Sequence, residues 1–251
     1  MAKVLGKKVQ SYSQASSKSL DPIDRGHRPQ QNGVDYWNAY EFTFLDKNKV
    51  PVLKVLEIQI PSTSKFTVES KSLKIYLNSF YKKQFSKDSE VLDKVKKDLN
   101  KLTKSDVKAK FITKFSESPD CINLNTLRAV NTKPNQVYCF IGFRSICPVT
   151  SQPDFANIYV TSGSVLNVSW LIKYFKSYAE RGDFHEHCVE SMFEDIQNQF
   201  RCASLEISGR FMRRGGIDIN PTRSSSKKLF FKNFIFFNQY HYIYNLFFSF
   251  Q

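Results

Sequence analysis

The stretch that decides the fold is residues 69–80, ESKSLKIYLNSF. Acidic and hydroxyl side chains gather at its start and apolar residues follow, which is typical of a helix N-terminus. We predict a short helix that ends at about Phe80, with Ser70 or Ser72 as its N-cap. Glu69 lies directly before this helix, either as part of a capping arrangement or as a ligand for a polar, planar group.

The elements around this helix are those of a small sheet. Residues 40–45 and 50–60 predict two strands joined by a tight turn, and residues 107–115 predict a third strand. Residues 88–103 predict a second helix, because their apolar side chains keep to one face. These side chains are Val91, Leu92, Val95, Leu99 and Leu102.

The second half of the chain shows a similar order of elements. We predict a strand at 155–161, helices at 165–180 and 185–200, and a closing strand at 205–211. Two consecutive helices between strands indicate an α+β fold with antiparallel sheets and paired helices on one face, and not a doubly wound fold. The residues at 116–136 predict a loop between the two halves.

Length, charge and cysteine content narrow the class of protein. The chain has 251 residues, a net charge of +14 and five cysteines without a CxxC pair. These values exclude collagen-like, wholly disordered and disulfide-framework classes, and the cysteines favour a reducing, cytoplasmic compartment. No membrane span or signal peptide is predicted. The charge favours an anionic partner, a nucleotide phosphate or a nucleic acid, although basic surfaces are also common without function.

The two ends of the chain differ from the rest. Residues 1–35 are polar and predict a mobile arm. Residues 229–251 hold 8 Phe and 3 Tyr but fit neither a helical nor a strand period. They are a docked aromatic segment, an interfacial anchor, or sequence foreign to the fold such as the product of a shifted reading frame, and we favour the last interpretation.

Cys147 lies among polar residues and prolines in RSICPVTSQPD, residues 144–154. A lone cysteine is most often a buried, apolar residue, but this composition does not fit a core strand. A thiolate at this position would be a nucleophile, and Asp154 would serve as its base or as a later proton donor.

A second cluster is FHEHCVE, residues 184–190. Glu186 and Glu190 are four residues apart and share a helix face, with His185 near the helix start. The helix dipole alone would explain carboxylates at this end. A zinc site is weakly supported, because the spacing matches no standard zinc motif.

Two basic segments are candidates for phosphate contact. Lys71 follows the start of the helix at residue 70, and the sequence RRGG at 213–216 places two arginines before two glycines. Paired glycines permit close backbone approach to a ligand, and arginine suits phosphate recognition, but basic turns are also common without a ligand. The chain has neither a GxGxxG motif nor a P-loop.

Taken together and in order, four segments resemble the motifs of one family. They are ESKSLKIYLNSF at 69–80, CPVTSQPDFANI at 147–158, FHEHCVESMFEDI at 184–196 and RRGGIDINPTRS at 213–224. Residues 35–224 are similar to the NADPH-dependent 7-cyano-7-deazaguanine reductases, the nitrile reductases of queuosine biosynthesis, in their longer two-module branch. The aromatic C-terminal segment lies outside this resemblance.

The resemblance implies tandem tunnelling-fold (T-fold) modules and a cytoplasmic homodimer. The implied parts are a flexible arm at 1–35, a first module at 36–118, a linker at 119–136, a second module at 137–224 and a divergent tail at 225–251. The implied ligands are a small deazaguanine substrate and NADPH, with no metal and no direct contact with nucleic acid or membrane.

The resemblance also implies roles for single residues. Cys147 would add to the nitrile carbon and form a covalent thioimide, and Asp154 would donate the proton. The implied substrate-binding residues are Val68, Glu69, Ser70, His185 and Glu186. The implied NADPH-binding residues are Ser70, Lys71, Arg214 and Gly215.

Two functions from other classes stay open on the residues alone. One is a cysteine-dependent nitrile or amide hydrolase that uses Cys147, His185 and Asp154. The other is a basic RNA-binding module without catalysis, whose affinity for tRNA would fall steeply with salt.

Overall fold

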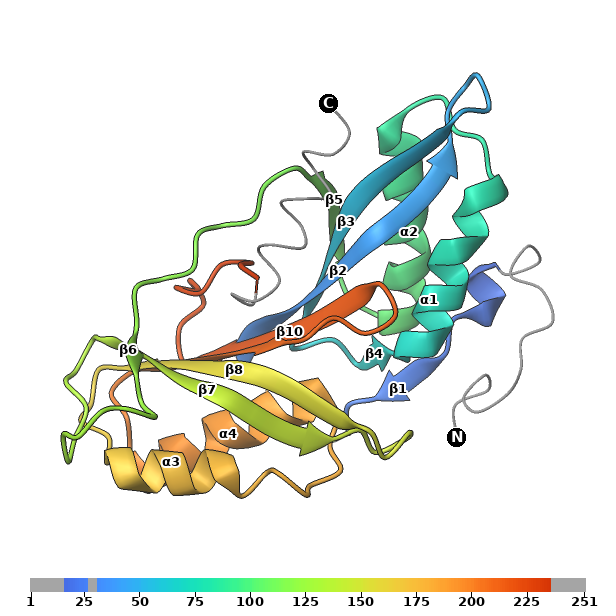
Figure 1. The fold of residues 1–251 in the computed structure, drawn as a ribbon. Helices are drawn as coiled ribbons and strands as arrows, with labels where there is room; N and C mark the ends of the chain where they lie inside the picture. The colour runs from blue at the N-terminus through green and yellow to red at the C-terminus, as the bar shows by residue number, and fades with distance from the viewer. Residues whose placement is uncertain (1–15, 27–30, 236–251) are drawn as a thin grey trace. The chain divides into compact units, whose positions relative to one another are not determined.

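The protein is described by a computed structural model over residues 16–26 and 31–235, which divide into two compact units (Figure 1). Within this described part, unit 1 takes its residues from 1–30, 34–113 and 213–218. Unit 2 takes its residues from 31–33, 114–212 and 219–251.

Unit 1 is built on an antiparallel sheet in which β3 lies between β2 and β5. A separate antiparallel pair, β1 and β4, precedes helix α1. The elements are η2 (Ser17–Ser19), β1 (Pro22–Asp24), β2 (Asn32–Leu45), β3 (Pro51–Pro61), β4 (Phe66–Val68), α1 (Ser70–Asn78), η3 (Ser79–Lys82), α2 (Asp88–Thr103) and β5 (Lys108–Ile112).

A side-chain-supported turn fixes the hairpin of β2 and β3. The backbone N–H groups of Asn48 and Val50 each donate to Oδ1 of Asp46 over 2.8 Å. Lys49 closes the turn in the left-handed region, with φ at 64°. Aspartate favours such turns because its carboxylate replaces a backbone acceptor, so this short polar stretch sets the register of the two strands.

The helices of unit 1 bury their apolar faces against its sheet. On α2, Val91, Val95 and Leu99 are fully buried, as the helical spacing predicts. The ring of Phe80, just after α1, lies 5.2 Å from that of Phe42 on β2. The predicted face of α2 is therefore confirmed at its centre, with Leu92 and Leu102 half-buried at its sides.

Unit 2 carries a sheet with the strand order β10, β9, β8, β7, β6. Its neighbouring strands are antiparallel except for the parallel pair of β6 and β7. The elements are β6 (Ile122–Asn123), β7 (Val137–Ile146), β8 (Pro153–Ser162), α3 (Val168–Lys176), α4 (His185–Phe200), β9 (Leu205–Phe211) and β10 (Ile217–Ser224), of which residues 217–218 belong to unit 1.

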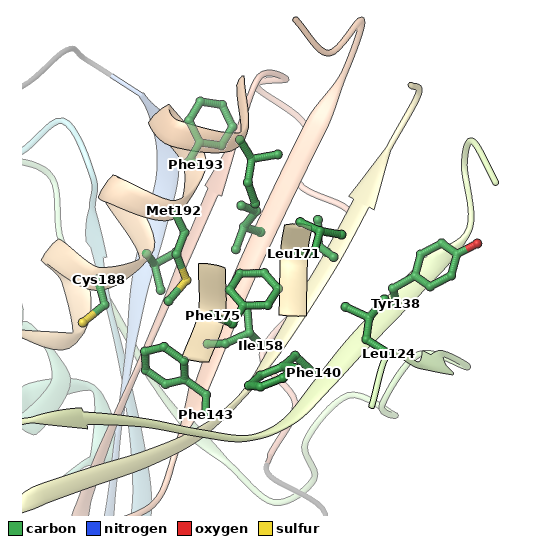
Figure 2. Packing of buried hydrophobic residues seen from close by; sticks show 14 of the residues in the cluster. Leu124, Tyr138, Phe140, Phe143, Ile158, Leu171, Phe175, Cys188, Met192 and Phe193 are labelled. Atoms are coloured by element: carbon green, nitrogen blue, oxygen red, sulfur yellow. The ribbon is translucent and has the colours of Figure 1, made fainter. Parts of the chain in front are cut away.

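The core of unit 2 lies between its sheet and the two helices α3 and α4 (Figure 2). Because side chains alternate along a strand, Tyr138 and Phe140 on β7 and Ile158 on β8 face the helices. Leu171 on α3 and Met192 on α4 meet them there, each fully buried. Unit 2 is therefore a sheet with both helices on one face.

Most predicted elements agree with the structure. Helices α2 and α4 and strand β9 have the predicted limits of 88–103, 185–200 and 205–211. The first helix ends two residues early and continues as η3, and the helix predicted at 165–180 is shortened to α3. The mixed α+β class with mainly antiparallel sheets is confirmed.

The N-terminal part of the chain contains elements that the sequence did not predict. The segment 1–35 was expected to be an arm, but η2, β1 and the first residues of β2 lie within it. Arg25 forms an ion pair with the buried Asp35, and its Nε donates to Ser64 over 3.0 Å. Residues 16–26 are thus tied to unit 1, whereas 1–15 and 27–30 lie outside the described residues.

The start of the aromatic segment packs on unit 2. Phe231 and Phe234 are each only 1% exposed and lie in one cluster with Cys139 and Tyr159. The ring of Phe234 stands edge-on to that of Tyr159 at 4.9 Å. Cys139 and Tyr159 alternate with the core residues of their strands, so this cluster occupies the sheet face opposite the helices.

Polar contacts fix the same segment. The N–H groups of Phe230 and Phe231 donate to the carboxylate of Glu206, over 3.0 and 2.6 Å. The Arg210 guanidinium lies 4.0 Å from the centre of the Phe234 ring. These contacts support the interpretation of a docked segment for residues 229–235, whereas our preferred interpretation, a sequence foreign to the fold, is not tested by them. Residues 236–251 lie outside the described part of the chain.

Within the described residues, none of the helices has the length and apolar character required to cross a membrane.

Candidate active site

The loop between β7 and β8 presents Cys147. The N–H of Cys147 donates to the carbonyl of Gln152 over 2.8 Å, and the N–H of Ser151 donates to the carbonyl of Cys147 over 3.0 Å. Ser151 adopts a left-handed conformation with φ at 55°. These bonds close a tight loop with the thiol half-buried at its base, which agrees with the prediction that Cys147 does not sit in a core strand.

The strand register places Asp154 on the same face as Cys147. Asp154 on β8 pairs directly with Ser145 on β7. Cys147 lies two residues beyond Ser145, and residues two apart on an extended chain point to the same face. Asp154 is only 4% exposed, so its carboxyl is held in a place of restricted solvent access.

His185, the first residue of α4, contacts Asp154. Its Nε2 lies 3.4 Å from Oδ2 of Asp154, and its Nδ1 lies 3.3 Å from the carbonyl oxygen of Ile219. The imidazole stacks on Phe211, with ring centres 3.8 Å apart and planes 6° from parallel. Both ring nitrogens and one ring face are therefore held in a single orientation.

These contacts constrain where a proton resides. A carbonyl oxygen only accepts, so Nδ1 carries a proton toward Ile219. Nε2 faces the Asp154 carboxyl, and a hydrogen bond between them places one proton between the two side chains, beside the face that bears Cys147.

Glu186 follows His185 in the first turn of α4. It is only 4% exposed. Helix α4 has no side-chain cap on its first N–H groups, because Phe184 occupies the N-cap position. The positive end of the helix dipole stabilises a carboxylate here. The simple expectation of an exposed charge at a helix start is wrong for Glu186.

In unit 1, Glu69 caps helix α1. Its carboxylate accepts hydrogen bonds from the N–H groups of Lys71 and Ser72, over 2.8 and 2.7 Å. Glu69 is therefore the N-cap, and our assignment of Ser70 or Ser72 was wrong. A carboxylate satisfies two N–H groups where one hydroxyl would satisfy one, and Glu69 keeps lone pairs for a further donor while only 3% exposed.

The neighbours of Glu69 lie where the chain turns from strand to helix. Val68 ends β4, pairs with Pro22 of β1 and is 1% exposed. Ser70 and Lys71 form the first turn of α1, and Oγ of Ser70 lies 3.5 Å from Oε1 of Glu69. Val68, Glu69, Ser70 and Lys71 are thus consecutive residues around one helix N-terminus.

Arg214 and Gly215 lie in a tight turn at the start of β10. The N–H of Arg214 donates to the carbonyl of Ile217 over 2.9 Å. Gly215 and Gly216 have φ at 58° and 79°, a region that disfavours side chains. A Cβ on Gly216 would lie 2.8 Å from Oε2 of Glu41, the far end of an exposed side chain, so the positive φ angles are the main reason that this turn favours glycine.

This turn borders a cavity of about 120 Å³ in unit 1. Lys74, from the second turn of α1, lines it together with Gly215 and Gly216. The Lys74 ammonium stands 3.4 Å from the point where a Cβ of Gly215 would lie. An ammonium beside bare backbone is suited to a phosphate group, so the set around Gly215 fits one end of a nicotinamide dinucleotide.

The structure gathers the predicted site residues into two sets. Unit 2 holds Asp154 in contact with His185, Glu186 one residue further along α4, and Cys147 on the loop that joins β7 and β8. Unit 1 holds Val68, Glu69, Ser70 and Lys71 at the start of α1, and Arg214 and Gly215 in the glycine turn.

Three contributors were missed by sequence reasoning. Phe211 on β9 and the carbonyl of Ile219 on β10 orient His185. The alternating patterns of these two strands do not indicate that they contact a histidine. Lys74 had a usable signal, because it lies three residues after Lys71 and so shares its side of the helix.

The other cysteines of unit 2 differ from Cys147. Cys139, Cys188 and Cys202 are buried, and Cys121 is exposed. Burial raises the pKa of Cys188 to about 12, which keeps it a neutral thiol at physiological pH. In the described residues, no three His, Cys, Asp or Glu side chains are grouped in a way that suits a metal ion.

Comparisons with known proteins agree on one kind of enzyme. A family model described as "Nitrile reductase, 7-cyano-7-deazaguanine-reductase N-term" matches residues 10–111. A second, described as "QueF-like protein", matches residues 153–229. These matches place the chain among the nitrile reductases.

Several curated relatives carry the name NADPH-dependent 7-cyano-7-deazaguanine reductase. The relative from Desulfotalea psychrophila is 36% identical over 222 residues, which cover 79% of this chain and 80% of the relative. Relatives from Buchnera aphidicola and Coxiella burnetii are 32% and 35% identical, over 77% and 82% of this chain and 83% and 82% of their own lengths. The chain belongs to the family of NADPH-dependent 7-cyano-7-deazaguanine reductases.

Proposed function

We propose that the protein reduces the nitrile of 7-cyano-7-deazaguanine to an aminomethyl group, with Cys147 as the nucleophile and Asp154 as the proton donor. The observation that carries this assignment is the buried Asp154, which contacts His185 and shares a sheet face with Cys147. Such a reaction belongs to the biosynthesis of queuosine, a modified tRNA nucleoside.

The first step is covalent addition. The Cys147 thiol gives its proton to the Asp154–His185 pair as its sulfur forms a bond to the nitrile carbon, and one bond of the nitrile triple bond breaks, leaving its electron pair on nitrogen. The proton held between Asp154 and His185 moves to that nitrogen, so no free anion develops. The product is a thioimide on Cys147. A nitrile is a poor hydride acceptor, and covalent addition replaces one hard step with easier ones.

NADPH, when bound, supplies the hydride for each of the two reductions that follow. Ser70 and Lys71 at the start of α1, with Arg214 and Gly215 in the glycine turn, would hold its phosphate-bearing part. The N-terminus of a helix and neighbouring cations favour phosphate, and Gly215 leaves the backbone bare beside Lys74. After the first reduction, Cys147 leaves as a thiolate and recovers a proton.

The two buried glutamates would recognise the base. A carboxylate accepts paired N–H donors, such as those on the edge of a guanine-like ring. Glu69 and Glu186, at 3% and 4% exposure, would make these contacts strong because few water molecules compete. Val68 and Ser70 of unit 1 and His185 of unit 2 are the other substrate-binding residues of this proposal.

The wider organisation belongs to the same proposal. We infer tandem T-fold modules at 36–118 and 137–224, a linker at 119–136, a homodimer and a cytoplasmic enzyme that contacts neither nucleic acid nor membrane. Each unit has two helices against a mainly antiparallel sheet, which supports this assignment.

The test is to incubate the protein with 7-cyano-7-deazaguanine and NADPH. We expect substrate-dependent loss of NADPH absorbance and, without NADPH, a protein adduct whose mass equals that of the nitrile. Cys147→Ala should lose both, and Cys121→Ser, which changes an exposed thiol, should keep both. An adduct that persists in Cys147→Ala would refute the nucleophile.

The hydrolase alternative makes a different use of the same residues. A cysteine hydrolase needs a histidine that receives the thiol proton, but both ring nitrogens of His185 already face Asp154 and the Ile219 carbonyl. Release of ammonia and a carboxylic acid from the nitrile without NADPH would nevertheless support the hydrolase alternative. An RNA-binding module would instead show salt-sensitive tRNA affinity and no NADPH consumption.

A further inference from the structure

A pair of cysteines lies outside the catalytic residues of unit 2. Cys121 is exposed in the loop directly before β6, and Cys139 lies buried in the middle of β7. The two thiols lie close enough to shift each other's pKa. Neither residue has a role in the proposed nitrile reduction.

The backbone keeps the two residues together. Strands β6 and β7 pair in parallel, with Asn123 opposite Cys139, and the N–H of Leu124 donates to the carbonyl of Cys139 over 2.9 Å. Cys121 lies two residues before Asn123, so an extended chain directs its side chain to the same face as that of Cys139.

The surroundings make the two sulfur atoms unequal. The neighbouring Cys139 thiol lowers the pKa of Cys121 to about 7. The neighbouring Cys121 thiol, together with burial beneath Phe231 and Phe234, raises the pKa of Cys139. Cys121 is thus an accessible thiolate near neutral pH, and Cys139 is a protonated thiol directly behind it.

We propose that Cys121 and Cys139 form a thiol–disulfide site, in which Cys121 attacks a small disulfide such as oxidised glutathione and Cys139 resolves the product. Residues 113–121 lie outside helices and strands, so closing the bond displaces the loop that bears Cys121 and leaves the sheet in place.

The exchange balances in two steps. The Cys121 thiolate forms a bond to one sulfur of oxidised glutathione and expels one glutathione thiolate. The Cys139 thiol then attacks the sulfur of Cys121, expels the second glutathione thiolate and passes its proton to that leaving thiolate. Two cysteine thiols are oxidised, and one glutathione disulfide is reduced to two thiols.

The direct test is a peptide map after equilibration with oxidised and reduced glutathione. Trypsin cuts after Lys114, Arg128 and Arg144, which separates the peptide 115–128 from 129–144 and leaves Cys147 on a third. We expect the first two peptides joined and two hydrogens lighter than their sum, with Cys147 elsewhere. Cys121→Ser should abolish this species while its thermal unfolding stays unchanged.

A second measurement follows the reactivity of Cys121 by its pH profile. At pH 7 a thiol with a pKa near 7 is half ionised, against about 3% for an ordinary cysteine, while the lower basicity costs about fivefold in nucleophilicity. Cys121 should therefore react with iodoacetamide about threefold faster than an unperturbed thiol.

Two variants of Cys139 separate its roles. Cys139→Ala should raise the pH at which Cys121 reaches half of its maximal rate with iodoacetamide. Cys139→Ser keeps a hydroxyl donor, so it should leave this pH near neutral, but it should not form the joined peptide. The proposal is overturned if Cys121 accumulates only as its glutathione adduct, or if Cys139→Ala leaves the profile unchanged in folded protein.

Discussion

The two units share the same order of helices and strands. They differ in the functional residues at their hairpin loops and helix starts. Each has a strand hairpin, two helices and a third strand. Helices α1 and α3 both span nine residues, and α2 and α4 both span 16. Both hairpins also contain one bulge, after Ala39 in unit 1 and after Ile141 in unit 2.

The difference lies in the hairpin loops and the helix starts. The loop of unit 1 is a turn closed by Asp46, whereas the loop of unit 2 presents Cys147. The buried carboxylate begins the first helix in unit 1, as Glu69, and the second helix in unit 2, as Glu186. Similar frameworks thus hold different chemistry, because function resides in the loops and element ends.

The largest expected effect tests whether the covalent chemistry belongs to the hairpin loop of unit 2 and not to that of unit 1. Cys147→Ala should lower kcat at least about a thousandfold, because the removed sulfur is the proposed covalent nucleophile. Steady-state NADPH consumption measures this. Lys47→Ala, in the corresponding exposed turn of unit 1, should leave kcat unchanged, and a comparable loss there would contradict the assignment of covalent chemistry to unit 2.

The second largest effect tests the transfer of a proton from Asp154 to the nitrile nitrogen. Asp154→Asn should lower kcat by about 10²–10⁴-fold, since the amide cannot deliver the proton to the nitrile nitrogen. The thioimide should also form more slowly in stopped reactions analysed by mass. Asp88→Asn removes a carboxylate that pairs with Lys54 at the surface of unit 1 and should have no effect on either rate.

The third effect tests the packing of the C-terminal segment on unit 2. Phe234→Ala should reduce the free energy of unfolding by about 3 kcal/mol, because it empties a buried aromatic site. Chemical denaturation followed by fluorescence measures this. Phe230→Ala is the matched control, since Phe230 is 56% exposed and should change stability by less than about 0.5 kcal/mol. Equal, small effects of both would show that the segment does not dock.

The smallest effects test whether the N-cap residues of α1 and α3 bind the substrate or only cap their helices. Glu69→Gln should raise KM for the deazaguanine by about 10–100-fold through loss of charge-assisted hydrogen bonds. Asn167 caps α3 through the N–H of Trp170 over 2.8 Å, and Asn167→Ala should cost about 1 kcal/mol of stability with KM unchanged. A stability loss without a KM change in Glu69→Gln would reduce Glu69 to a cap.

Regular elements were predictable where a single periodic signal dominated. The limits of α2, α4 and β9 follow from uninterrupted apolar patterns. Strand β7 was not predicted, although a cysteine and aromatic residues alternate along it, because its neighbours in sequence are loop-like. Strand β1 is only three residues long and owes its existence to pairing with β4, which no local pattern reveals.

The site was predictable in its residue types and not in its contacts. Cys147 and Asp154 stand out through the polar composition of their segment, but the contact of His185 with Asp154 depends on the pairing of β8 with β9 and on the position of α4. The capping by Glu69 was obscured because serine is the commoner N-cap. The docking of Phe231 and Phe234 had no periodic signal, since irregular segments leave none.

The docked residues 229–235 also bear on how the protein behaves in concentrated solution. They cover the sheet face that holds Tyr159, Cys139 and the aliphatic part of Arg210. A chain shortened at residue 228 would expose that face as a contiguous apolar patch, the kind of surface that drives self-association. Light scattering and the yield of soluble protein would then reveal this self-association, even where the catalytic rate is unchanged.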